Sequence, residues 1–143
     1  MHELHPNLLW LGHAFDIREP RPLYDVAITA VVDVAFEESP AMMPRDFIYL
    51  RFPLNDGGGN EPCTLRLAIQ TVVELLHSGN RTIVACSVGM SRSPTIAAFA
   101  LAFYLGISPE LALERIAAMK SLEIKGQLWN DCAAIFPEVR RPI

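Results

Sequence analysis

The sequence predicts an α/β fold in which a central, mostly parallel sheet of four to five strands is flanked by helices. β-Branched residues and alternating apolar positions indicate strands over residues 8–11, 28–34, 47–53 and 82–85. Between the third and fourth of these strands, residues 63–77 have the periodicity of a helix. A helix that connects two strands is the arrangement expected of a parallel sheet.

The helix expected over residues 63–77 has one apolar face and a defined end. Its apolar side chains recur at helical spacing: Leu65, Ile69, Val72, Val73 and Leu76. Ser78-Gly79-Asn80 follows directly, and a glycine at this place is typical of a helix carboxyl terminus. One face of this helix should therefore cover the sheet.

Three more helices are expected after the fourth strand. The first spans residues 94–105 and ends at Gly106. The second begins after the capping residue Ser108, with Pro109 in its first position, and runs to about residue 120. A short helix over residues 128–135 closes the chain.

Length and composition indicate one globular domain over residues 1–143. Hydrophobic residues make up 51% of the chain and charged residues 20%, which is enough for a single sizeable core. The longest apolar stretch, residues 96–107, is too short to span a bilayer, so we expect a buried core helix there. The amino terminus lacks the regions of a signal peptide. We therefore expect a cytoplasmic monomer that does not associate with a membrane.

Charge and cysteine content exclude several classes of protein. The net charge is −4 and the 12 basic residues are scattered, which argues against a nucleic-acid partner. The three cysteines form no Cys-x-x-Cys pair, so neither a disulfide framework nor a zinc site is indicated. No metal and no cofactor are expected.

The residues from Cys86 to Ser93 place a nucleophile, an anion-binding loop and a cation in one turn. They follow the strand expected over residues 82–85 and lead into a helix. A loop that feeds a helix amino terminus directs backbone N–H groups at a common centre, which favours a phosphate dianion and a thiolate. The residues expected to bind phosphate are Ser87, Val88, Gly89, Met90, Ser91 and Arg92.

Three side chains of this loop are candidate catalytic residues. Cys86 would attack the phosphorus of a phosphate monoester and form a cysteinyl-phosphate; the alternative is a buried cysteine that only ends a core strand. Arg92 can grip two phosphate oxygens with its planar guanidinium, which a lysine could not do. Ser93 can donate its hydroxyl to the sulfur of Cys86, or it can cap the helix.

A glycine-rich loop carries the candidate general acid. Residues 55–62 read Asn-Asp-Gly-Gly-Gly-Asn-Glu-Pro, and three consecutive glycines suggest close approach to a ligand or a mobile lid rather than an ordinary turn. The loop leaves the third expected strand at the same end as the Cys86 loop. Asp56 would protonate the leaving oxygen and then activate water, with Glu61 as the alternative carboxylate.

The ten residues from Cys86, Cys-Ser-Val-Gly-Met-Ser-Arg-Ser-Pro-Thr, resemble the active-site loop of the cysteine-dependent protein tyrosine phosphatase superfamily, in its small dual-specificity branch. The resemblance covers roughly residues 4–120 in the family's order. Further matching segments are the strands at 6–12 and 28–34, the general-acid loop at 52–56 and the paired helices at 98–119. The resemblance implies a dual-specificity phosphatase-like fold.

The resemblance also implies a metal-independent phosphoprotein phosphatase. Its substrates would be proteins or peptides that carry phosphotyrosine, or phosphoserine and phosphothreonine. The uncharged residues Ser87, Val88, Met90 and Ser91 favour a singly phosphorylated side chain, because phosphoinositide and RNA phosphatases of the superfamily carry extra basic residues near the loop. A rhodanese-like sulfurtransferase would have four residues after its cysteine, where this loop has five.

Two positions depart from the family pattern. Ala85 stands where a histidine usually precedes the nucleophile, so the thiolate has less support. The family's carboxyl-terminal motif, whose asparagine braces the catalytic loop, is missing; residues 120–127 stand in that region, and whether Gln127 substitutes is open. These departures support the alternative that the chain is a catalytically weak domain that binds phosphorylated partners.

Overall fold

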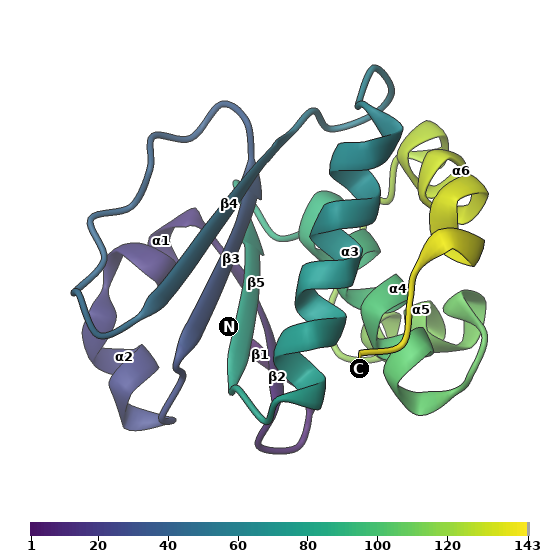
Figure 1. The fold of residues 1–143 in the computed structure, drawn as a ribbon. Helices are drawn as coiled ribbons and strands as arrows, with labels where there is room; N and C mark the ends of the chain where they lie inside the picture. Colours follow the sequence, from purple (N-terminus) through teal and green to yellow (C-terminus); the bar gives the residue numbers. More distant parts are fainter. Residues whose placement is uncertain (143) are drawn as a thin grey trace.

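The computed structural model describes residues 1–142 and contains a five-stranded sheet with helices on both faces (Figure 1). The strand order is β1-β2-β5-β3-β4. β1 pairs antiparallel with β2, and all other neighbours are parallel. The strands are β1 (His2–His5), β2 (Leu9–His13), β3 (Ala30–Ala35), β4 (Ile48–Leu54) and β5 (Thr82–Cys86).

The helices form two unequal layers. Four of them cover one face of the sheet, α3 (Pro62–His77), α4 (Arg92–Leu105), α5 (Pro109–Ala117) and α6 (Gly126–Ile135), and a 3₁₀ turn, η1 (Phe136–Glu138), follows α6. The short helices α1 (Ala14–Arg18) and α2 (Pro20–Asp25) lie on the opposite face. α4 is buried over its first eleven residues, as expected for a core helix.

The predicted sheet and its main helices are confirmed, whereas β1, α1 and α2 were not expected. β1 has the sequence His-Glu-Leu-His, in which Leu4 is the one buried side chain, so it shows no strand pattern. α1 and α2 have five and six residues, too few for a helical period to be recognised. Each of the three depends on the contacts it makes within the folded protein.

Successive residues of β5 face opposite layers. Val84 and Cys86 pack with the core under α3 and α4, whereas Ile83 and Ala85 pack with Trp10 on the side of α1 and α2. This alternation directs the side chain of Cys86 toward the amino terminus of α4. The strand that carries the candidate nucleophile is thus held from both faces.

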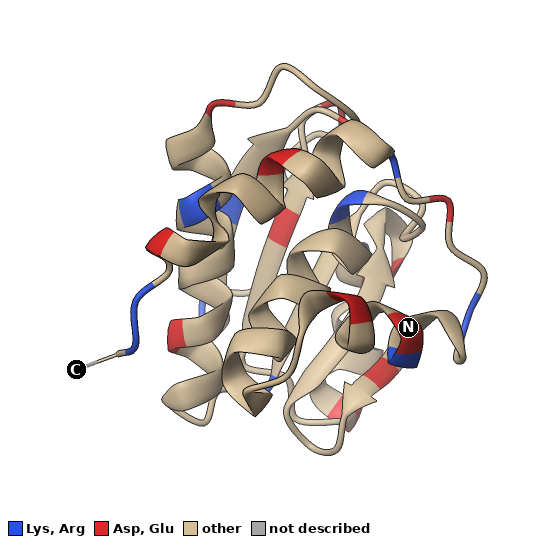
Figure 2. Cartoon of the chain, turned by 90° about the vertical axis from the view of Figure 1, so that its right-hand side faces the viewer, with Lys and Arg blue, Asp and Glu red and all other residues tan. Residues whose placement is uncertain are grey.

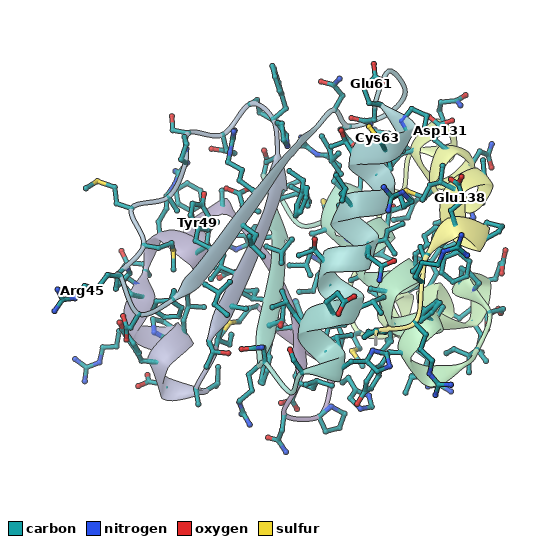
Figure 3. All side chains as sticks on the ribbon, in the orientation of Figure 1. Arg45, Tyr49, Glu61, Cys63, Asp131 and Glu138 are labelled. Atoms are coloured by element: carbon teal, nitrogen blue, oxygen red, sulfur yellow. The ribbon has the colours of Figure 1, made fainter. Side chains whose placement is uncertain are left out.

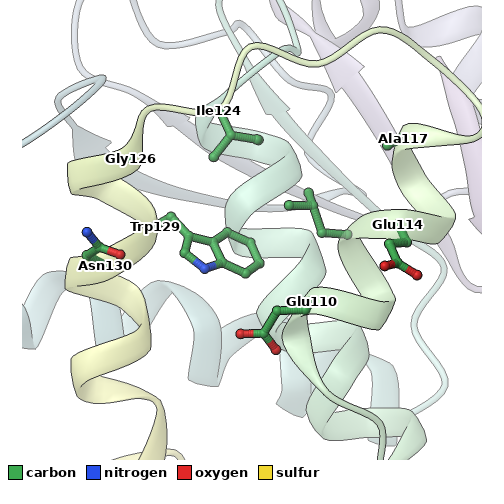
Figure 4. Close-up of a pocket in the computed structure, with 8 residues that line it drawn as sticks. Glu110, Glu114, Ala117, Ile124, Gly126, Trp129 and Asn130 are labelled. Atoms are coloured by element: carbon green, nitrogen blue, oxygen red, sulfur yellow. The ribbon is translucent and has the colours of Figure 1, made fainter.

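Two surface features complete the fold. Lys and Arg positions are spread over several elements and interspersed with Asp and Glu (Figure 2). A groove of about 440 Å³ opens between α5 and α6, with Leu113, Ile124 and Trp129 among its lining residues and none from the Cys86 loop (Figure 4). Within residues 1–142, the helices are too short or too polar to cross a membrane.

Candidate active site

Cys86 is the last residue of the central strand β5, and its side chain is buried. β5 lies between β2 and β3 and is parallel to both. The loop after Cys86 leads directly into α4, which begins at Arg92. The carboxyl end of a central parallel strand, next to a helix amino terminus, is a common place for anion-binding sites in α/β folds.

Gly89 allows the loop to fold back onto the sulfur of Cys86. Its φ of +73° lies in the left-handed region, and a Cβ there would be 2.9 Å from the carbonyl oxygen of Gly12. Its N–H donates to Cys86 Sγ at 3.3 Å. A larger residue at this position would therefore disturb a hydrogen bond that stabilises a thiolate.

Ser93 lies beside the sulfur, as the sequence predicts. Its Oγ is 3.2 Å from Cys86 Sγ and 3.4 Å from the carbonyl oxygen of Gly12, and the side chain is fully buried. The residue that flanks the start of α4 is Ser91, not Ser93. The geometry thus favours the contact with sulfur over the capping alternative.

Arg92 is buried and forms a two-pronged pair with Glu37. Nη1 and Nη2 donate to Glu37 Oε1 and Oε2 at 2.5 and 2.6 Å, and Nη1 also donates to the carbonyl oxygen of Leu54 at 2.9 Å. Burial acts to lower the pKa of Arg92, but the hydrogen bond and charge of Glu37, with smaller contributions from Cys86 and Asp56, raise it. The guanidinium is therefore a fixed cation at this site.

The Arg92 guanidinium has a second edge, formed by Nε and Nη2. Glu37 occupies the edge formed by Nη1 and Nη2, and Nη2 also reaches Ser87 Oγ at 3.4 Å. Nε is buried and has no hydrogen-bond partner among residues 1–142. This edge can donate to two oxygens of an oxyanion in a forked arrangement if Nη2 exchanges its long contact with Ser87 Oγ for one of them.

The sequence analysis missed Glu37, whose position is set by hydrogen bonds that hold the loop after β3. Arg51 on β4 holds the loop after β3 by donating from Nη2 to three carbonyl oxygens, those of Ala35, Phe36 and Glu38, at 3.2, 3.1 and 2.8 Å. Glu37 sits between two of these anchored residues. No periodicity or motif marks it, because its role depends on the position of Arg92.

We expect Glu37→Gln to reduce stability at neutral pH and to have a smaller effect in acid. The hydrogen bond from Arg92 lowers the pKa of Glu37 from 4.5 to about 2, against the opposing effect of burial. A lowered acid pKa contributes stability above the unfolded-state value of 4.5 and loses it as the pH falls toward 2. Because Glu37 is half exposed, we expect a loss of roughly 1 kcal/mol at pH 6.

Urea denaturation at pH 6 and pH 3 measures this difference. The difference in free energy of unfolding between wild type and Glu37→Gln should be, at pH 3, less than about half of its value at pH 6. Glu61→Gln is the control, because Glu61 forms no ion pair within residues 1–142 and should show no such trend. An equal gap at both pH values would contradict the ion pair.

The loop that carries Asp56 lies at the same end of the sheet as Cys86, since β4, β3 and β5 are parallel. The side chain of Asn60 closes it: Oδ1 accepts from the N–H of Asn55 at 2.7 Å, and Nδ2 donates to the carbonyl oxygens of Asn55 and Gly57 at 3.0 and 3.2 Å. Asp56 is exposed, and its charge contributes to the raised pKa of Arg92. Asp56 is thus within electrostatic range of the cation.

Glu61, the alternative acid, lies at the other end of this loop. It flanks the start of α3, close to Cys63, and its side chain is exposed (Figure 3). Its backbone carbonyl accepts the N–H groups of Thr64 and Leu65. Glu61 thus lies at a helix start, and of the two carboxylates in this loop only Asp56 contributes to the raised pKa of Arg92.

The chain is similar to known proteins in sequence and in fold. No family model matches the chain. The chain is 28% identical over 118 residues to dual specificity protein phosphatase 15 of Mus musculus and of Rattus norvegicus, covering 80% of this chain and 48% of each relative. The chain therefore spans about half the length of the curated relatives that it matches.

Solved structures share the fold. Human DUSP28 superimposes with a TM-score of 0.84 at 19% identity, covering 96% of both chains. DUSP15 superimposes with a TM-score of 0.78 at 22% identity, covering 95% of this chain and 86% of that one. The chain is thus similar in sequence to dual specificity protein phosphatase 15 and shares the fold of solved dual-specificity phosphatases. A human tyrosine phosphatase-like serine/threonine/tyrosine-interacting protein has the same fold, with a TM-score of 0.82 at 16% identity over 96% of both chains.

Ala85 leaves the candidate nucleophile, Cys86, without an imidazole at the preceding position. Its methyl group is fully buried in the apolar layer that contains Trp10 and Ile83. The hydrogen-bonding neighbours of Cys86 Sγ are the N–H of Gly89 and the hydroxyl of Ser93. Support for the sulfur thus comes from the loop itself and from the first turn of α4.

Gln127 does not take the place of the family's asparagine. Its Nε2 donates to Asp131 Oδ1 at 2.7 Å, one turn further along α6. A Cβ on Gly58 would be 3.0 Å from Cγ of Gln127, so this side chain packs against the glycine-rich loop. In the described part of the chain, Gln127 forms no hydrogen bond to the Cys86 loop. Gln127 therefore does not brace the Cys86 loop by a hydrogen bond.

Proposed function

We propose that the domain hydrolyses phosphate monoesters of phosphoproteins, on phosphotyrosine and on phosphoserine or phosphothreonine, through a cysteinyl-phosphate. The observation that carries this proposal is the shared environment of Cys86 and Arg92. The sulfur receives an N–H from Gly89 and lies 3.2 Å from Ser93 Oγ, while Nε of the buried Arg92 guanidinium has no hydrogen-bond partner within residues 1–142. The similarity to dual specificity protein phosphatases supports the same chemistry.

In the first step, the thiolate of Cys86 attacks phosphorus in line with the ester oxygen. The S–P bond forms, the P–O bond to the substrate side chain breaks, and Asp56 gives its proton to the departing oxygen. The N–H groups of the loop and the free edge of Arg92 stabilise the charge on the three remaining oxygens.

In the second step, water attacks the phosphorus of the cysteinyl-phosphate. The Asp56 carboxylate takes a proton from this water, the P–S bond breaks, and inorganic phosphate is released. Sulfur leaves as a thiolate, which the Ser93 hydroxyl and the Gly89 N–H stabilise. Because a thiolate nucleophile is readily oxidised, we propose a reducing compartment such as the cytoplasm.

Hydrolysis of p-nitrophenyl phosphate in the presence of a metal chelator tests the proposal. We expect turnover that the chelator does not reduce, because no step requires a metal. A requirement for Mg²⁺ or Zn²⁺ in a metal-stripped preparation would place the protein in another mechanistic class.

Ala85 favours a second candidate, a domain that binds phosphorylated partners and turns them over poorly. Loss of the usual histidine weakens support for the thiolate but leaves the Arg92 edge and the loop N–H groups in place. This candidate predicts that wild-type protein binds a phosphopeptide without releasing phosphate. The presence of both Cys86 and Arg92 favours the enzyme.

We expect Asp56→Asn to reduce kcat on alkyl phosphates far more than on an aryl phosphate. Phosphoserine and phosphothreonine need a protonated leaving oxygen, and general acid catalysis contributes typically ~10² to 10⁴-fold. The variant should also lose the alkaline limb of the bell-shaped pH profile, because no carboxyl group remains to deprotonate.

The matched control is Glu61→Asn, which alters the other carboxylate of the same loop. Both variants are compared on phosphothreonine peptide and on p-nitrophenyl phosphate across the pH range. If Asp56→Asn kept the bell-shaped pH profile and lost equal activity on both substrates, Asp56 would not be the general acid and Glu61 would be the next candidate.

A further inference from the structure

The segment between α5 and α6 lies against the Cys86 loop and contacts it at two backbone carbonyls and one side chain. Nζ of Lys120 donates to the carbonyl oxygen of Gly89 at 2.8 Å. The N–H of Glu123 donates to the carbonyl oxygen of Met90 at 2.9 Å, and the N–H of Lys125 donates to Ser91 Oγ at 3.2 Å. Figure 4 shows this irregular segment running between Ala117 and Gly126.

The two hydrogen bonds to the carbonyls of Gly89 and Met90 orient N–H groups of the anion-binding loop. In a trans peptide the C=O and the following N–H point to opposite sides, and no cis peptide occurs in residues 1–142. When Lys120 holds the carbonyl of Gly89, the N–H of Met90 must point away from the segment. The N–H of Glu123 holds the carbonyl of Met90 in the same way, so the N–H of Ser91 also points away from the segment.

Lys120 is the side-chain member of this set, because Glu123 and Lys125 use backbone N–H groups. Its ammonium is partly buried and tightly packed: a Cβ on Gly89 would lie 3.1 Å from Nζ. A hydrogen bond from a charged donor is stronger than one between neutral groups. A substitution of Lys120 therefore removes the contact to Gly89 and leaves the backbone contacts of Glu123 and Lys125 in place.

We propose that Lys120 is a positioning residue for the phosphate-binding loop, acting in place of the missing asparagine. It holds the Gly89–Met90 peptide so that the N–H of Met90 faces the oxyanion. This inference rests on the proposed function, since it assumes that the loop binds an oxyanion.

Lys125 offers a control for the charge of Lys120. It lies on the same segment, carries the same charge, and its side chain forms no hydrogen bond or ion pair within residues 1–142. Lys120→Met and Lys125→Met each remove one positive charge near the loop. A purely electrostatic effect would be similar in both variants and would be screened by salt.

The test measures the dissociation constant of tungstate, a phosphate mimic, by calorimetry with the full chain at 0.1 and 0.5 M salt. We expect Lys120→Met to weaken binding about tenfold and Lys125→Met by less than about threefold, in line with the loss of one charge-assisted hydrogen bond. The ratio between the two variants should persist at high salt. kcat/KM on p-nitrophenyl phosphate should fall in parallel.

Two further measurements separate positioning from folding. Lys120→Arg keeps the charge and the donors and should bind tungstate within about threefold of wild type. Thermal unfolding without anion reports stability alone, so a Lys120→Met variant with a lower Tm and unchanged tungstate affinity would overturn the inference.

The outcomes also distinguish this inference from the proposed function. Equal tungstate affinity in Lys120→Met and Lys125→Met, with wild type binding tungstate and turning over substrate, would overturn only the role of Lys120. A wild-type protein that neither bound tungstate nor hydrolysed p-nitrophenyl phosphate would contradict the proposed function, and the inference with it.

Discussion

Cys86→Ser should reduce the hydrolysis of p-nitrophenyl phosphate to the background rate while the protein still folds and binds an oxyanion. The serine hydroxyl occupies nearly the same volume in this buried position. However, the hydrogen-bonding neighbours of the sulfur within residues 1–142 are an N–H and a hydroxyl, and neither can act as a general base for a serine. The nucleophile is therefore lost and the anion-binding loop is kept.

Steady-state turnover, tungstate binding and acid-quenched phosphoenzyme together measure this result. Wild type should form a covalent phosphoenzyme and Cys86→Ser should not. Cys63→Ser is the control, because Cys63 is an exposed free cysteine at the start of α3 and should be dispensable. Turnover by Cys86→Ser at a rate like that of wild type would contradict the assignment of Cys86 as the nucleophile.

Arg92→Lys should lower kcat/KM by about 10² to 10³-fold, the range found when a donor that stabilises transition-state charge is removed. The guanidinium serves two partners along two different edges. One edge meets the carboxylate of Glu37, and on the other edge Nε has no hydrogen-bond partner within residues 1–142. An ammonium group has no second edge, so Lys would pair with Glu37 or with the phosphate but not with both.

The loss should appear in both kcat and KM, because the forked contact binds the ground state and tightens in the transition state. Arg18→Lys is the control: Arg18 pairs with Glu38 at 2.6 Å in the neighbouring loop and is exposed. A near-normal kcat/KM for Arg92→Lys would show that the phosphate cradle lies elsewhere.

Much of the fold could be predicted because its main elements carry strong local patterns. β3 and β5 are short runs of β-branched and small residues, and α3 has a clear apolar face. β1 could not be predicted, because an edge strand with one buried side chain has no pattern of its own. α1 and α2 were missed for the same reason, since short helices are stabilised by packing rather than by propensity.

The sequence by itself determined which residues make up the candidate active-site loop. Cys86, Gly89, Arg92 and Ser93 lie within eight residues, so a turn from the strand into the helix keeps the candidate nucleophile, the glycine, the cation and the hydroxyl close together. The structure placed Ser93 on the sulfur and turned Gly89 back toward it, in agreement with that spacing.

Only the tertiary structure decided what holds this loop in place. Glu37 is 55 residues from Arg92, and Lys120 is 31 residues from Gly89, so no local pattern relates either pair. Their contacts arise because parallel strands bring the loop after β3 to the end of β5, and because the chain returns between α5 and α6. Orientation of a guanidinium or a peptide requires a partner at a defined distance, and that distance exists only once the sheet and helices have packed.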